Sequence, residues 1–177
     1  MTPNSTMIRI IQDVEEGAQP PVRITQLLRS PPQIFFSFPL AVSMLPEWNR
    51  VLSTLGEQSV NIRFINQSFE ENEAYRVSLC VDKVNDERIP EISTMISRLL
   101  GKAGPGREAR IVPGAIILSF YVFKGQPRFI GGILKVLRDG GIEMLSAGVA
   151  SSVLSCVIRQ FALNAALDAL AELSWAN

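Results

Sequence analysis

The chain has 177 residues, with 17 basic and 17 acidic side chains, two cysteines and no histidine. A net charge of zero argues against nucleic acid or an anionic membrane as a partner, because both attract a broad positive field. The missing histidine removes the commonest general base and metal ligand, so we expect no catalytic residue, no metal and no cofactor.

In chain order, the hydrophobic pattern predicts strands, where apolar residues alternate, and helices, where they recur every three or four positions. The first half holds a strand at 22–28, a strand at 33–39, a helix at 46–58, two strands within 61–83, a helix at 87–102 and a strand at 108–112. The second half holds a strand at 114–123, a helix at 126–141, strands at 142–147 and 152–160, and a helix at 161–175.

The two halves repeat one order of elements. Residues 33–112 follow the order βαββαβ and residues 113–177 follow βαββα, so the second half lacks its last strand. An antiparallel sheet without that strand would leave an open edge. We therefore expect residues 22–28 to complete the second domain, which makes the first domain an insertion within it. Residues 1–21 form an N-terminal segment with room for one short strand.

Antiparallel four-stranded sheets with both helices on one face have the ferredoxin-like topology of the α+β class, which serves many functions. The run VNIRFINQS, residues 60–68, resembles the second strand of the first ACT domain in aspartokinase regulatory regions, with Asn61 and Gln67 on the matching amides. The run GIEMLS, residues 141–146, resembles the corresponding strand of the second ACT domain, and Pro127 matches the proline that opens its first helix. Nothing resembles the kinase catalytic domain.

Several positions depart from the ACT pattern. The Pro-Gly that opens the first helix is replaced by Leu45-Pro46, and the glycine of the second domain is Arg128. Arg63 stands where the family has an acidic residue, and Ala147-Gly148 follow Ser146 in place of Thr-Ser. The identity of the ligand therefore stays open, and so does the loss of ligand binding.

The resemblance implies that a free amino acid binds between paired ACT domains, at the start of the first helix and the end of the second strand. Backbone N–H groups at a helix N-terminus accept a carboxylate, and a side-chain amide both donates and accepts hydrogen bonds. The residues implied are Glu47, Trp48, Gln67 and Asn61 in the first domain, and Arg128, Phe129 and Ser146 in the second. Asn66 and Gln67 point to opposite faces of their strand, and Gln67 is the expected contact.

The leading hypothesis is a non-catalytic, amino-acid-responsive regulatory protein that forms homodimers through its ACT domains and acts on a separate biosynthetic enzyme. The hydrophobic fraction of 47% supports a large domain or subunit interface. One alternative is an ACT-type module that has lost its ligand and only associates. RNA binding is a weaker alternative, because the sheet aromatics lack the RNA-recognition pattern.

Two further expectations concern the cysteines and the location of the protein. Cys80 and Cys156 lie in apolar runs without the spacing of a metal or redox motif, so buried free thiols are expected. The sequence shows no membrane-length apolar segment, and its first residues lack the features of a secretory signal. These features favour a cytoplasmic protein.

Overall fold

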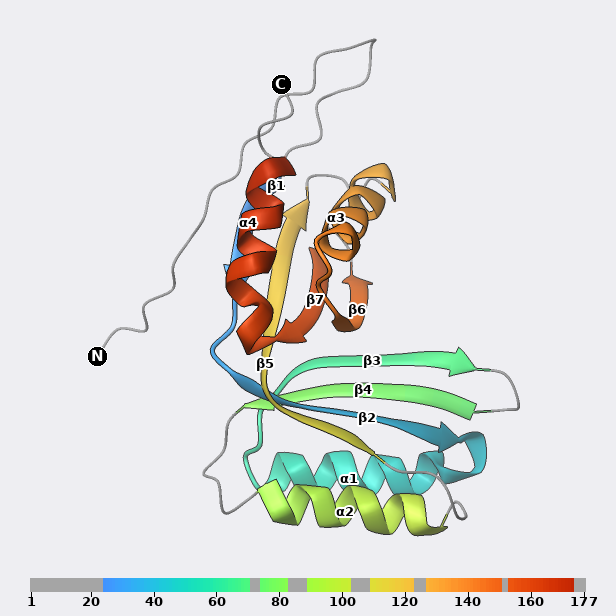
Figure 1. Ribbon diagram of the computed structural model, residues 1–177. Coiled ribbons are helices and arrows are strands. Elements are labelled where there is room, and N and C mark those ends of the chain that lie inside the picture. The colour runs from blue at the N-terminus through green and yellow to red at the C-terminus, as the bar shows by residue number, and fades with distance from the viewer. Residues whose placement is uncertain are drawn as a thin grey trace. The chain divides into compact units, whose positions relative to one another are not determined.

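The computed structural model describes residues 24–70, 74–82, 89–102, 109–122, 127–150 and 153–173 (Figure 1). The N-terminal segment expected at 1–21 lies outside these residues. The chain divides into two compact units, which we call the middle unit (residues 32–115) and the outer unit (residues 1–31 and 116–177). Both ends of the described part of the chain therefore belong to the outer unit.

The middle unit is a sheet covered on one face by two helices. Its elements are β2 (Gln33–Ala41), a 3-10 turn (Val42–Met44), α1 (Leu45–Glu57), β3 (Ile62–Glu70), β4 (Ala74–Asp82), α2 (Ile89–Lys102) and the first part of β5 (Arg110–Val122). The strand order is β3-β4-β2-β5, with antiparallel pairing between neighbours. Figure 1 shows α1 and α2 side by side on one face of this sheet.

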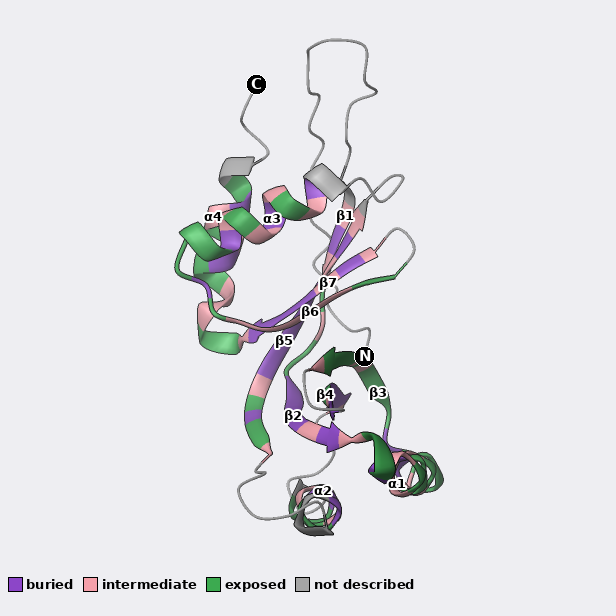
Figure 2. Cartoon of the chain, turned by 90° about the vertical axis from the view of Figure 1, so that its right-hand side faces the viewer, coloured by how far each residue is buried: buried purple, intermediate pink, exposed green. Residues whose placement is uncertain are grey.

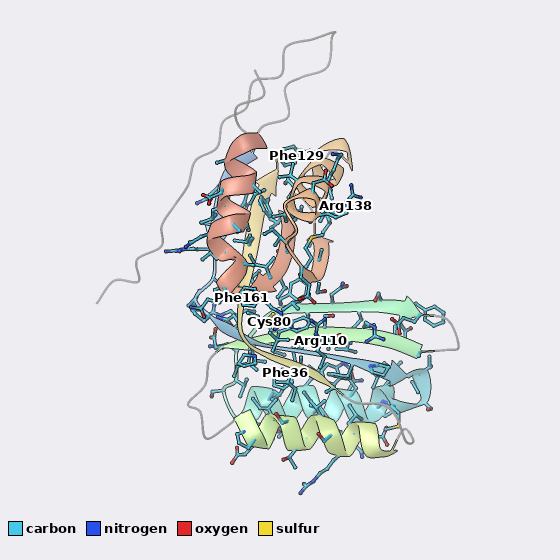
Figure 3. The ribbon with its side chains drawn as sticks, in the orientation of Figure 1. Phe36, Cys80, Arg110, Phe129, Arg138 and Phe161 are labelled. Carbon is cyan, nitrogen blue, oxygen red and sulfur yellow. The ribbon has the colours of Figure 1, made fainter. Side chains whose placement is uncertain are left out.

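The core of the middle unit follows the predicted periodicities. Alternate residues of β2 and β4 point to the helices, and Phe36 is fully buried among them (Figure 3). The helical face expected from 46–58 is confirmed, because Trp48 and Leu55 are buried and Val51 packs against the same cluster. From α2 the cluster takes Ile92, Ile96 and Leu99.

The outer unit is built from both ends of the described chain. It contains β1 (Ile24–Arg29), the second part of β5, α3 (Pro127–Asp139), β6 (Met144–Ala150), β7 (Val153–Arg159), a 3-10 turn (Gln160–Ala162) and α4 (Leu163–Leu173). The strand order is β1-β5-β7-β6. β1 pairs antiparallel with β5, from Ile24 opposite Val122 to Arg29 opposite Leu118.

One continuous strand, β5, replaces the two strands expected at 108–112 and 114–123. The prolyl ring of Pro113 removes a backbone donor, and the sequence suggested a break there. Gly114, whose φ is 70°, allows the register of β5 against β2 to shift at this point. Gln33 of β2 pairs with Ala115 and Ile34 pairs with Pro113, so Gly114 between them has no partner residue in β2. The strand then continues into the outer unit without interruption.

The helices α1 and α3 end in the same way. The amide of Gly141 (φ 71°) donates to the carbonyl of Arg138 and that of Ile142 to the carbonyl of Leu137, both at 2.9 Å. This pair of hydrogen bonds is a Schellman motif, and it confirms the predicted stop at Gly140-Gly141. The amides of Ser59 and Val60 make the same two bonds at the end of α1, with Ser59 at φ 56°.

Candidate functional site

The candidate site in the middle unit begins at the first turn of α1. Pro46 occupies the start of the helix, where a missing N–H costs nothing, and Glu47 adds a negative charge near the positive end of the helix dipole. Trp48 is 1% exposed and packs edge-to-face on Phe38, with 5.4 Å between the ring centroids. This turn therefore places the N-terminus of a helix beside a fixed aromatic side chain.

The indole Nε1 of Trp48 is buried and has no hydrogen-bond partner in the part of the chain that the structure describes. Leaving such a donor unsatisfied costs about 1–3 kcal/mol. This N–H group lies inside the core cluster of the middle unit, near the start of α1.

Gln67 and Asn66 occupy opposite faces of β3, as the alternation of the strand predicts. In the pairing register, Gln67 lies opposite Val77, and Val77 lies opposite Phe38 on the next strand. Paired residues share a face, so Gln67 lies on the helix-covered face in the same row as Phe38, on which Trp48 packs. The register thus brings Gln67 and the start of α1 to the same part of the middle unit.

The outer edge of β3 exposes apolar side chains on the same face as Gln67. Ile65 is 45% exposed and Phe69 is 65% exposed, with the Phe69 ring edge-to-face on Tyr75 at 5.4 Å. β3 is the first strand of the sheet order, and Figure 2 shows most of it in the colour of exposed residues. Exposed apolar side chains along a sheet edge are typical of a strand that pairs with another chain.

Asn61 takes part in an ion-pair cluster rather than facing Gln67. Its side-chain Nδ2 donates to Asp82 Oδ2 at 3.1 Å, and Arg63 Nε donates to Asp82 Oδ1 at 2.7 Å. The hydrogen bond from Arg63, followed by that from Asn61, holds the pKa of the Asp82 carboxyl below its ordinary value, although burial opposes the shift. Arg63 therefore joins the beginning of β3 to the end of β4.

Of the three residues expected in the second domain, the structure describes the side chains of Phe129 and Ser146, which lie on opposite sides of the outer unit's sheet. Phe129 is 9% exposed and belongs to the core cluster of the outer unit on α3 (Figure 3). Ser146 lies opposite Val157 on β6, whereas its neighbour Ala147 packs against the core cluster, so Ser146 points away from the helices. The side chain of Arg128 is outside the described residues.

Both cysteines are free and buried, as expected, and burial raises the pKa of each thiol to about 12. They do not occupy equivalent places. Cys156 lies in the helix-facing core of the outer unit. Cys80 lies opposite Phe35 and alternates with the core residues of β4, so it points to the other face of its sheet.

The described residues also contain no group of three or more His, Cys, Asp or Glu side chains placed to hold a metal ion. Within the same ranges, no helix is long and apolar enough to cross a membrane.

A groove of about 230 Å³ between α1 and α2 was not predicted from the sequence. It is lined by Glu47, Arg50, Val51, Thr54, Met95, Arg98 and Leu99. The spacing of 47, 50, 51 and 54 marks one stripe of a helix, which is the signal available in the sequence. The sequence does not show that this stripe of α1 faces α2 across a groove.

No protein-family model and no curated protein matches the sequence. Solved structures do match the fold. The regulatory subunit of aspartate kinase from Thermus thermophilus, in a ligand-free form, has a TM-score of 0.66 at 15% identity, covering 84% of this chain and 97% of that chain. The regulatory subunit from Thermus flavus gives 0.68 at 16% identity, with the same coverage of both chains.

A third match is aspartokinase III from E. coli, in a complex with lysine and aspartate, with a TM-score of 0.56 at 13% identity. It covers 98% of this chain but 34% of that one. The fold is therefore that of aspartate kinase regulatory subunits and regulatory domains, a mixed α/β fold with an antiparallel sheet, and a kinase catalytic domain is absent from these 177 residues.

Proposed function

We propose that this chain is a non-catalytic regulatory protein that binds a free amino acid and acts on a separate biosynthetic enzyme in the cytoplasm. The observation that carries the proposal is the fold match to regulatory subunits, of which it covers 97%. Those proteins are regulatory subunits of aspartate kinase, which supports a non-catalytic role for this chain.

We interpret the two units as ferredoxin-like ACT-type domains. Both units have the same strand order across the sheet when the strands of each unit are numbered first to fourth: fourth, first, third, second. In the middle unit this order is β5-β2-β4-β3, and in the outer unit, with β1 counted as the fourth strand, it is β1-β5-β7-β6. The fourth strand of the outer unit is the N-terminal β1. The division of the chain at residues 31–32 and 115–116 supports a middle domain inserted in the outer one.

The amino acid is assigned to the middle unit, where the first turn of α1 and the end of β3 come to the same part of the sheet. The N–H groups of Glu47 and Trp48 would receive its carboxylate, because the helix dipole favours a negative charge there. The amide of Gln67 would hold its ammonium or a polar side chain.

The same site is completed by a second copy of the chain in this proposal. β3 is an edge strand, and its exposed Ile65 and Phe69 flank Gln67 on one face. Pairing of two β3 edges would remove these apolar side chains from water and place the two Gln67 amides near each other. The expected dimer therefore forms through the middle unit.

A ligand-free association module is the second candidate function. The cluster of Asn61, Arg63 and Asp82 favours it, because the polar groups at the beginning of β3 are already engaged within the chain. This candidate predicts the same dimer but no response to any amino acid.

Thermal melting in the presence of single amino acids tests the proposal. Lysine, threonine, methionine, leucine and aspartate come first, followed by the remaining standard amino acids. A ligand at about 100 times its Kd stabilises by about 2.7 kcal/mol, which raises the melting temperature of a chain of this size by about 5–11 °C. A shift caused by a neutral or basic amino acid should be abolished by Gln67→Ala and preserved by Ser68→Ala, on the opposite face of β3. Unchanged melting with every amino acid would leave the association module as the function.

A further inference from the structure

The groove between α1 and α2 is a mixed surface with an apolar floor and a charged rim. Val51, Met95 and Leu99 form the apolar part of its lining. Its volume of about 230 Å³ lies below the roughly 300–1,000 Å³ of sites for drug-sized ligands. A groove of this size suits a small metabolite.

Three charged side chains line the groove without pairing. Arg50 and Glu47 come from α1, and Arg98 comes from α2. In the part of the chain that the structure describes, ion pairs engage Arg63, Arg76, Lys135, Arg138 and Arg159, but none engages these three side chains. The rim therefore presents two guanidinium groups and one carboxylate that are available to a ligand.

We propose that this groove binds an acidic α-amino acid, of the size of glutamate or aspartate. Such a ligand carries two carboxylates and one ammonium, which complement the two guanidinium groups and the one carboxylate of the rim. A guanidinium can hold a carboxylate with two parallel hydrogen bonds, so each arginine takes one carboxylate. Glu47 accepts from the ammonium, and the methylene groups lie on the apolar floor.

This site is separate from the one proposed at the end of β3. Gln67 and Trp48 do not line the groove. Glu47 belongs to both sites: its backbone N–H lies in the first turn of α1, and its side chain lines the groove. The two sites therefore respond to different substitutions.

Calorimetric titration of the full-length chain with L-glutamate tests the proposal. Arg50→Gln and Arg98→Gln should each weaken binding about tenfold or more, because each removes a charge-assisted contact. Arg138→Gln, which removes an equal charge from α3 of the outer unit (Figure 3), should leave binding unchanged. Circular dichroism of each variant checks that it folds.

Two further ligands test the charge assignment. Glutarate has both carboxylates but no ammonium, and leucine has one carboxylate and an ammonium. Both should bind at least about tenfold more weakly than glutamate to the unmodified chain. Glu47→Gln should weaken glutamate but not glutarate, because only glutamate offers the ammonium that Glu47 accepts. The proposal is overturned by the absence of heat up to 10 mM glutamate, by binding that ignores both arginine variants, or by tighter binding of leucine.

Discussion

Ser59 ends helix α1 in the left-handed conformation that Gly141 adopts at the end of α3. Both residues make the same Schellman hydrogen bonds, so the two helix ends form a natural matched pair. An L-residue in this conformation is destabilised by about 1–2 kcal/mol relative to glycine, whose greater freedom in the unfolded chain offsets about 0.4–1 kcal/mol. Ser59→Gly should therefore stabilise the middle unit by about 0.5–1 kcal/mol.

The reverse substitution provides the control. Gly141→Ser should destabilise the outer unit by a similar amount, and backbone strain alone should cause it, because a Cβ at Gly141 would meet no atom within 4 Å. Thermal unfolding followed by circular dichroism measures both changes, and each should appear as a shift in melting temperature of about 1–4 °C. A lower stability of Ser59→Gly, or a neutral Gly141→Ser, would refute the assignment of strain to Ser59.

Three other predictions follow from contacts in the two units. Phe69→Glu should weaken self-association, measured by sedimentation, because Phe69 lies on the proposed interface at β3. Phe161 is more exposed (84%) but lies outside β3, so Phe161→Glu should leave self-association unchanged. Equal effects of the two substitutions would contradict an interface at β3. The folded-state pKa of Asp82 is below its ordinary value near 3.8, so its stabilisation is present above that pH and is lost as the pH falls through the lower folded value. Asp82→Asn should therefore lose less stability than the unmodified chain between about pH 5 and pH 2, and identical acid titrations would contradict the Arg63 ion pair. Because burial raises the pKa of Cys80 and Cys156 to about 12, a thiol reagent at neutral pH should modify them only after unfolding, and fast labelling of the folded chain would exclude this burial.

Local patterns predicted most elements of both units. The alternation in β2 and β4 and the helical spacing of Trp48, Val51 and Leu55 come from burial of one face, and burial is what the structure shows. The end of α3 follows from Gly140-Gly141, since glycine takes the left-handed conformation at low cost. These features depend on neighbours in the sequence.

Features that depend on pairing between distant residues were not predictable in the same way. The continuity of β5 through Pro113 depends on Gly114 and on the register with β2. Asn61 is engaged by Asp82, 21 residues away, so its match to a ligand-binding motif does not show where its amide points. Cys80 and Cys156 stand at similar places in the two repeats. Relative to the alternation of buried residues along their strands they differ by one position, so Cys156 faces the helices of its unit and Cys80 faces away from the helices of its own.

The candidate site shows the same division. The sequence placed Gln67 on one face of β3 and Glu47 and Trp48 in the first turn of a helix. Only the register from Gln67 through Val77 to Phe38 brings them to one part of the middle unit. The groove between α1 and α2 depends on how two amphipathic helices meet, and no single segment contains that information.

Hydrogen–deuterium exchange of the full-length chain, with and without the amino acid that gives the largest melting shift, tests the central claim most directly. Bound ligand should slow exchange at residues 45–48 and 66–70, where the helix N-terminus and the end of β3 would close on it. Protection confined to other segments, or unchanged exchange under saturating ligand, would contradict it.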